Sequence, residues 1–141
     1  MKLSVQTDLL TYINDYLPTV IDYENAAVTS YGSVSGDNFT NDYDMHAALT
    51  DEIIPNYQKL IEGLDGFSVK LKTDEIKELN AKYIEVAKTN MSAFVILENM
   101  IETEDESKAE DFNERLEKGQ ILLGEWQAKL RALCNEHEVQ M

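Results

Sequence analysis

The residues best suited to binding a metal ion are Asp42, Asp44 and His46, which stand just before an apolar helical pattern. Asp42 and His46 are four residues apart and would share one face of a helix. Carboxylate oxygens and an imidazole nitrogen are common ligands of divalent ions. The run lacks the Gly and the terminal Glu of a calcium-binding loop, and acids at a helix start need no metal to explain them. The three residues are therefore weak metal candidates, and no cofactor is expected.

A second pair with reactive side chains is Cys134 and His137. It offers two ligands, whereas a structural zinc site needs four, and a thiol–imidazole nucleophile would lack a third, orienting group. Di-iron bundles need a Glu three residues before each inward His, and neither His46 nor His137 has one. The sequence assigns no catalytic residue and predicts that the protein is not an enzyme.

Negative charge is most concentrated between residues 98 and 117, where nine acids accompany only Lys108 and Arg115. Over the whole chain, 27 acids and 12 bases give a formal charge of −15, which disfavours binding to nucleic acid or to an anionic membrane surface. The acids either serve solubility or attract a protein with a basic surface. In the second case the contacts are expected in an acidic turn made of Glu98, Glu102, Glu104, Asp105, Glu106, Glu110 and Asp111.

Helices must position these side chains, and the clearest helical pattern runs from Asp74 to Glu104. It contains neither Gly nor Pro, and apolar residues recur at every third or fourth position. Thr73 is the predicted N-cap. Asn90 falls on the apolar stripe and is expected to face the interior. A helix about 45 Å long with one wet face needs neighbours of similar length along the other.

Three further segments have the same periodicity and supply those neighbours. The first runs from Val5 to Tyr31 across Pro18, the second from a cap at Thr40 to Leu64 across Pro55, and the last covers residues 108–137. Proline removes a backbone donor and clashes with the preceding turn. Because the apolar phase is kept on both sides of each proline, we expect two bent but continuous helices.

Turn residues mark the connections between these helices. Gly32–Phe39 and Gly63–Lys72 are predicted to be connections, and Ser107 with Glu110 has the spacing of a capping box. Gly119 lies within the last apolar stripe, where close approach of a facing aromatic side chain would explain it. Hydrophobic residues make up 43% of the chain, enough to form a core. The sequence predicts an all-α protein, a single up-down-up-down antiparallel four-helix bundle spanning residues 1–141 as one domain.

Tyrosines are frequent, with seven in the chain. Most should be core residues with the hydroxyl at the boundary of the core, because their rings fall on the apolar stripes. A tyrosine-lined pocket for a small ligand is the alternative. The tyrosines on the stripes are Tyr16, Tyr23, Tyr31, Tyr57 and Tyr83.

Several short motifs lie between Tyr23 and Leu64: a Tyr shortly before Ser-Val, then Gly-Asp-Asn-Phe-Thr, and later Ile-Ile-Pro-Asn-Tyr. With these motifs, the helix from Lys118 and the ending near Asn135-Glu136-His137, the chain resembles an uncharacterised family of small helical proteins from Gram-positive bacteria. Members often follow a lipoprotein signal or a membrane anchor, so the resemblance implies an extracytoplasmic, membrane-anchored domain. It implies no activity. A cytoplasmic location is expected instead if Met1 is the true start.

The predicted function is protein–protein binding by a non-catalytic, strongly acidic helical domain associated with the cell envelope. One alternative is an acidic inhibitor of the immunity or antitoxin type, which covers a basic site on a toxin. Another is a carrier of a small ligand or a metal. No apolar run approaches the roughly 20 residues that cross a bilayer, so no direct membrane insertion by this segment is expected.

Overall fold

The computed structural model describes residues 2–140, with side chains from residue 5 onward. Within that part the chain is helical and has no strand, which confirms the all-α prediction. The segments α1–η1–α2 and α3–η3–α4 are each continuous, so that with α5 and α6 they form four long helical segments. The elements are α1 (Lys2–Thr11), η1 (Tyr12–Tyr16), α2 (Leu17–Gly32), η2 (Gly36–Asn38), α3 (Asp42–Ala48), η3 (Leu49–Ile53), α4 (Ile54–Ser68), α5 (Asp74–Thr103) and α6 (Ala109–Glu136).

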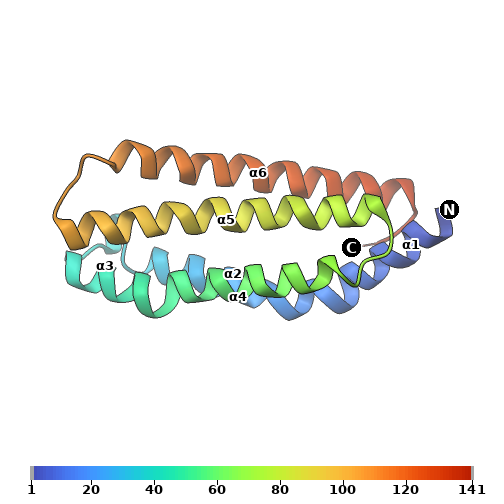
Figure 1. Cartoon of the computed structure of the whole chain (residues 1–141), viewed down its shortest axis with the longest axis horizontal. Coiled ribbons are helices and arrows are strands. Elements are labelled where there is room, and N and C mark those ends of the chain that lie inside the picture. Colours follow the sequence, from blue (N-terminus) through green and yellow to red (C-terminus); the bar gives the residue numbers. More distant parts are fainter. Residues whose placement is uncertain (1, 141) are drawn as a thin grey trace.

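Helix α5 is the central element of the arrangement. It packs along both α4 and α6, while α2 packs against α4 (Figure 1). The α5–α6 connection and α3 lie at one end of the molecule. The α4–α5 connection, the start of α1 and the end of α6 lie at the other (Figure 1). The start of α3 is thereby brought beside the end of α5, although they are far apart in the sequence.

Both prolines lie inside continuous helical segments, as predicted. Pro18 follows the π-helical turn η1, and Pro55 follows the π-helical turn η3. In each case the N–H of the residue before the proline donates to the first carbonyl of the π turn. A π turn adds one residue to a helical turn, which changes the backbone register next to the ring that would otherwise clash with the preceding turn. Both prolines are therefore accommodated in the same way, by a π turn that ends two residues before the ring.

The extra residue of each π turn also rotates the buried face of the adjoining helix, relative to the face that an unbroken α-helix would bury. In the first segment the α-helical period of apolar residues predicts Ile13 on the inner face, but Tyr12 is fully buried and Ile13 is only half-buried. In the second the same period predicts His46 on the inner face, but Met45 is buried and His46 is half-exposed. A strict step of three and four residues does not anticipate this rotation.

The predicted connection Gly63–Lys72 is wrong, because α4 continues through Gly63 to Ser68. A Cβ atom on Gly63 would collide with the Val20 side chain of α2. Gly63 is thus a close-packing position between α2 and α4 rather than a turn residue, and the actual connection is residues 69–73.

The predicted cap at Thr40 is also wrong. The N-cap of α3 is Asn41, whose Oδ1 accepts from the Asp44 backbone N–H at 2.8 Å. The Thr40 hydroxyl instead donates to the Asp44 carboxylate at 2.7 Å. Both residue types can cap, and the backbone conformation selects the one nearer the helix.

The capping box predicted at Ser107 and Glu110 is not formed. Helix α6 begins at Ala109, and its N-cap residue, Lys108, makes no capping hydrogen bond with its side chain. The Ser107 backbone N–H donates to Asp105 Oδ1 at 2.9 Å, so Ser107 belongs to the turn before the helix.

Thr73 occupies the predicted N-cap position of α5, but its hydroxyl makes a different bond. It donates to Asp8 Oδ2 of α1 at 2.7 Å. The same oxygen accepts the backbone N–H groups of Lys72 and Thr73 at 3.0 and 2.9 Å. Asp8 is only 6% exposed. One carboxylate from the first helix therefore holds the α4–α5 connection, and charge-assisted bonds of this kind are stronger than neutral ones.

We predict that Asp8→Ala lowers the free energy of unfolding by roughly 2–3 kcal/mol, because three donors lose a charged acceptor in a buried place. Asp22→Ala removes one charge from an exposed position of the same helical segment and should change stability by about 0.5 kcal/mol or less. Urea denaturation of both variants measures the difference. Equal effects would mean that the Asp8 bonds add nothing to stability.

Candidate functional site

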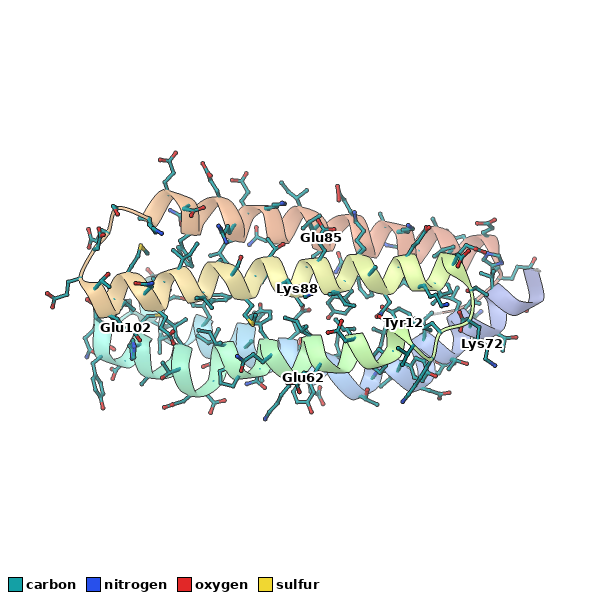
Figure 2. The ribbon with its side chains drawn as sticks, in the orientation of Figure 1. Tyr12, Glu62, Lys72, Glu85, Lys88 and Glu102 are labelled. Atoms are coloured by element: carbon teal, nitrogen blue, oxygen red, sulfur yellow. The ribbon has the colours of Figure 1, made fainter. Side chains whose placement is uncertain are left out.

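The metal candidates and the acidic turn, predicted separately, lie at the same end of the molecule. His46 Nε2 and Glu102 Oε1 are 2.9 Å apart, although 56 residues separate them in the sequence. Figure 2 shows Glu102 beside α3, near the α5–α6 connection. We call the acidic turn together with Asp42 and Asp44 the acidic end.

The structure places His46 in a different group of side chains from the other two metal candidates, Asp42 and Asp44. His46 lies with Glu98 and Glu102, and one ligand atom from each falls within 4.8 Å of the others. Asp42 and Asp44 are exposed and are not part of that group. Three ligands are fewer than a structural zinc site needs, and the His46–Glu102 pair accounts for two of them without an ion. The group alone assigns no metal.

The turn after α5 has a defined conformation. Glu104 has a φ of 53°, the left-handed conformation common just after a helix, and the Asp105 N–H donates to the Met100 carbonyl at 3.1 Å. The bond from the Ser107 N–H holds the pKa of Asp105 below its ordinary value. Its contribution to stability is therefore present above the ordinary pKa and is lost as the pH falls through the lowered one. Asp105 is part of the turn's architecture, whereas Glu102, Glu104 and Glu106 are exposed carboxylates beside it.

A groove of about 530 Å³ opens at the acidic end. Its apolar lining residues are only half-buried, and its acidic lining residues are exposed. Apolar surface surrounded by carboxylates can receive an apolar side chain from a segment that also carries positive charge. The lining residues are Leu97, Met100 and Ile101 on the apolar side and Asp42, Glu104 and Glu106 on the acidic side.

The last two residues of the acidic turn, Glu110 and Asp111, lie in the first turn of α6. Carboxylates there interact favourably with the helix dipole. Asp111 Oδ1 also lies 3.3 Å from Arg115 Nε, one turn further on. Local interactions therefore explain these two acids. The exposed acids without such a partner among the described residues, Glu104 and Glu106, lie in the connection between α5 and α6.

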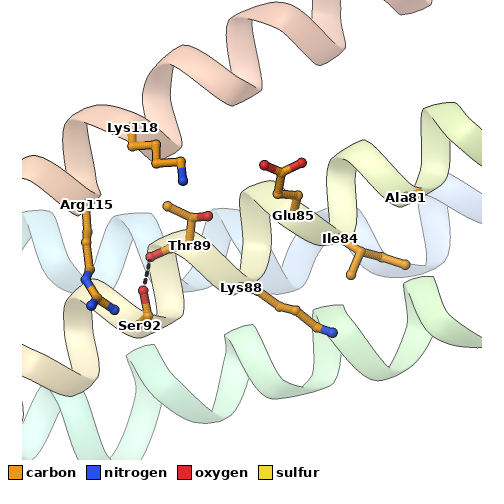
Figure 3. Close-up of a pocket in the computed structure, with 8 residues that line it drawn as sticks. All are labelled: Ala81, Ile84, Glu85, Lys88, Thr89, Ser92, Arg115 and Lys118. Carbon is orange, nitrogen blue, oxygen red and sulfur yellow. Dashed lines mark hydrogen bonds between the residues drawn. The ribbon is translucent and has the colours of Figure 1, made fainter.

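A second groove, of about 550 Å³, lies between α5 and α6 and contains three cationic residues, Lys88, Arg115 and Lys118 (Figure 3). In Figure 3 the Lys118 amine lies towards Thr89, while Lys88 extends away from it. Glu85 lines the same groove, and Arg115 already has its ion pair with Asp111. The groove thus contains charges of both signs, and its lysine side chains extend in different directions. We therefore assign no ligand to it.

A third candidate site is a cavity of about 270 Å³ bounded by α2, α4, α5 and α6, and it is partly open to solvent where Val28 and Gln120 are exposed. Most of its lining is apolar or aromatic, with a few polar groups, which is the usual character of a small-molecule site. Tyr31, Tyr57 and Asn90 were predicted on inner stripes, but Glu24 and Gln120 were not, because neither falls on an apolar row. The lining residues are Glu24, Val28, Tyr31, Tyr57, Asn90, Phe94, Leu116, Gly119, Gln120 and Leu123.

Polar groups near this cavity are incompletely satisfied. Glu24 Oε2 and the Tyr83 hydroxyl are buried without a hydrogen bond of standard geometry among the described residues. Burial raises the pKa of Glu24 above its ordinary value, and the nearby Tyr83 hydroxyl opposes this only in part. Burial and the Glu24 charge together raise the pKa of Tyr57, while the Asn90 amide acts in the opposite direction. Perturbed groups of this kind gather at functional sites more often than elsewhere.

Gly119 of α6 faces Asn90 of α5, not an aromatic side chain as predicted. A Cβ atom at Gly119 would collide with Asn90 Oδ1. The glycine therefore leaves room for the amide that reaches the Tyr57 hydroxyl in the cavity wall. The prediction that Asn90 faces the interior is confirmed, although the side chain is half-buried rather than fully enclosed.

The pair Cys134 and His137 lies at the end of α6. Cys134 is buried, and burial raises the pKa of its thiol, which disfavours the reactive thiolate. His137 Nε2 lies 3.9 Å from Glu136 Oε2.

Comparison of the chain with protein-family models, with curated proteins and with solved structures found no match. Among residues 2–140, none of the helices combines the length and the apolar character needed to cross a membrane. The acidic end and the cavity are therefore the two candidate sites of the protein.

We predict different effects for alanine at two glycines of α6. Gly124→Ala adds a Cβ in open space and should raise stability by about 1 kcal/mol through helix propensity. Gly119→Ala must displace Asn90 and should be less stable than Gly124→Ala by about 1 kcal/mol or more. In an Asn90→Ala background the two substitutions should become equivalent, as measured by thermal unfolding. A difference that persists in that background would contradict the assigned contact.

Proposed function

We propose that this protein is a non-catalytic binding domain whose acidic end receives a basic, amphipathic segment of a partner protein. The observation that carries the proposal is the groove in which half-buried Leu97, Met100 and Ile101 lie beside exposed carboxylates. A surface that carried only acids would be explained equally well by solubility as by binding. The neighbouring apolar residues add surface that a partner can cover and remove from water once it has bound.

The two parts of this surface have different roles in binding. The carboxylates attract positive charge over a distance of about 8 Å at physiological salt and mainly raise the association rate. The apolar floor becomes buried only in the complex and mainly slows dissociation. A lysine-rich or arginine-rich helix with one apolar face satisfies both parts.

The proposal includes the up-down-up-down antiparallel order predicted from the sequence. It is supported by the packing of α5 along α4 and α6 and by the His46–Glu102 contact, which joins α3 to the end of α5. We place the domain outside the cytoplasm, attached to the membrane through another segment, as the family resemblance implies.

The test uses a synthetic amphipathic helical peptide of Lys and Leu and measures its association with the full chain by stopped-flow fluorescence. Changing Asp42, Glu104 and Glu106, the acids that line the groove, to Lys should slow association at least about tenfold at low salt and change dissociation less. Asp105 is left unchanged because its carboxylate accepts from Ser107 and shapes the turn.

The matched control changes the exposed Asp22, Glu62 and Asp65 to Lys. Both triple variants alter the net charge of −15 by the same amount, so only the position of the charge differs. If the control slows association as much as the test variant, attraction is a property of the whole molecule and the acidic end is not the binding surface. Met100→Gln, which makes the floor polar, should instead speed dissociation of the peptide.

A further inference from the structure

The cavity differs from the acidic end in its degree of enclosure and in its charge. It is walled by four helices, and Glu24 is the one charged residue in its lining. None of the ion pairs found among the described side chains includes Glu24. The cavity therefore holds one carboxyl group with no cationic partner among the side chains of residues 5–140.

An uncompensated carboxylate in such a place is costly. Removing a charge from water is unfavourable unless an opposite charge or hydrogen bonds replace the water. Glu24 lowers the cost by favouring its protonated form, which is the direction in which burial moves its pKa. A bound cation would lower the cost in another way, by placing an opposite charge beside the carboxyl group.

Aromatic rings form much of the remaining wall. Phe94 of α5 lies 4.8 Å from the ring of Tyr31 on α2 and 5.7 Å from the ring of Tyr57 on α4, between ring centroids. Aromatic faces attract cations, most strongly where water is excluded. The amides of Asn90 and Gln120 add hydrogen-bonding groups to the same wall. An anion would meet the Glu24 charge and no compensating cation, so the lining selects against it.

We infer that the cavity is a binding site for a small organic cation, specifically an amine that carries an aromatic or similarly compact apolar group. The ammonium group binds the Glu24 carboxylate, and the apolar group packs against the part of the wall that Tyr31, Tyr57 and Phe94 form. An apolar cavity of about 150 Å³ can hold a single benzene ring, so 270 Å³ leaves room for a ring with a short amino side chain. This site is separate from the acidic end and does not depend on the function proposed for it.

The probe is 2-phenylethylamine, and 2-phenylethanol is its uncharged counterpart of similar shape. Isothermal titration calorimetry with the full chain should show binding of the amine, and binding should persist in about 0.5 M salt, because a buried pair is screened much less than exposed charges. Nuclear Overhauser contacts from the bound probe should reach the rings of Tyr57 and Phe94. Amine binding that disappears in salt, or contacts only to surface residues, would overturn the inference.

Glu24→Gln removes the charge and keeps the side-chain shape. It should weaken amine binding by about 10- to 100-fold and leave binding of the alcohol nearly unchanged, because only the charged interaction is lost. Glu62→Gln, at an exposed position, is the control and should leave both affinities as they are. Equal binding of the amine by the Glu24→Gln variant and the original chain would overturn the inference, as would failure of the amine to bind the original chain.

Misfolding does not obscure this comparison. The raised pKa of Glu24 means that its favourable contribution to folding is present below the ordinary pKa of about 4.5 and is lost as the pH rises through the raised value. At neutral pH a neutral glutamine should therefore be at least as stable as the carboxylate. Thermal unfolding of the variant verifies that it is folded before its affinity is measured.

Discussion

Helix α5 buries one face against both α4 and α6, and the positions of the other helices follow from that burial. Its inner residues from Ile76 to Phe94 are largely removed from water, and both α4 and α6 pack along them. Beyond Phe94 the apolar stripe continues in the sequence, but its residues are only half-buried. The core thus ends before the helix does. That mismatch leaves half-buried apolar surface at the acidic end, beside exposed carboxylates.

The same core contains polar groups that a tightly packed apolar interior would exclude. Asn80 is fully buried, and its amide nitrogen donates to the Leu64 carbonyl at 2.8 Å and to Ser68 Oγ at 3.1 Å, while its Oδ1 has no hydrogen-bond partner among the described residues. Asn80 therefore links α4 to α5 through its two donated hydrogen bonds, whereas Glu24 Oε2 makes no such bond within the described part of the chain. The difference between the two residues lies in the charge that Glu24 can carry, because an ionised carboxylate is far more costly to bury than a neutral amide.

Sequence periodicity predicted the four helical segments and their continuity through Pro18 and Pro55, because the apolar phase reflects the face that each helix buries. It could not predict contacts between distant residues. Asp8 binds the α4–α5 connection across 64 residues of sequence, and no local pattern marks it. Gly63 was read as a turn residue because glycine serves both turns and close helix packing, and only the position of a neighbouring helix distinguishes the two. Glu24 was missed for a related reason, since an isolated acid on a helix is normally exposed.

The two proposed sites both attract positive charge, yet their physics differs. At the acidic end several exposed carboxylates share the task, so each contributes little and salt screens all of them. At the proposed amine site a single carboxyl group supplies the attraction, so one substitution should remove it and salt should have little effect. A space of about 270 Å³ is too small for a peptide helix, and a small amine gains little from a solvated surface. The two sites have charge of the same sign, so the degree to which their carboxyl groups are exposed to solvent is what would distinguish their partners.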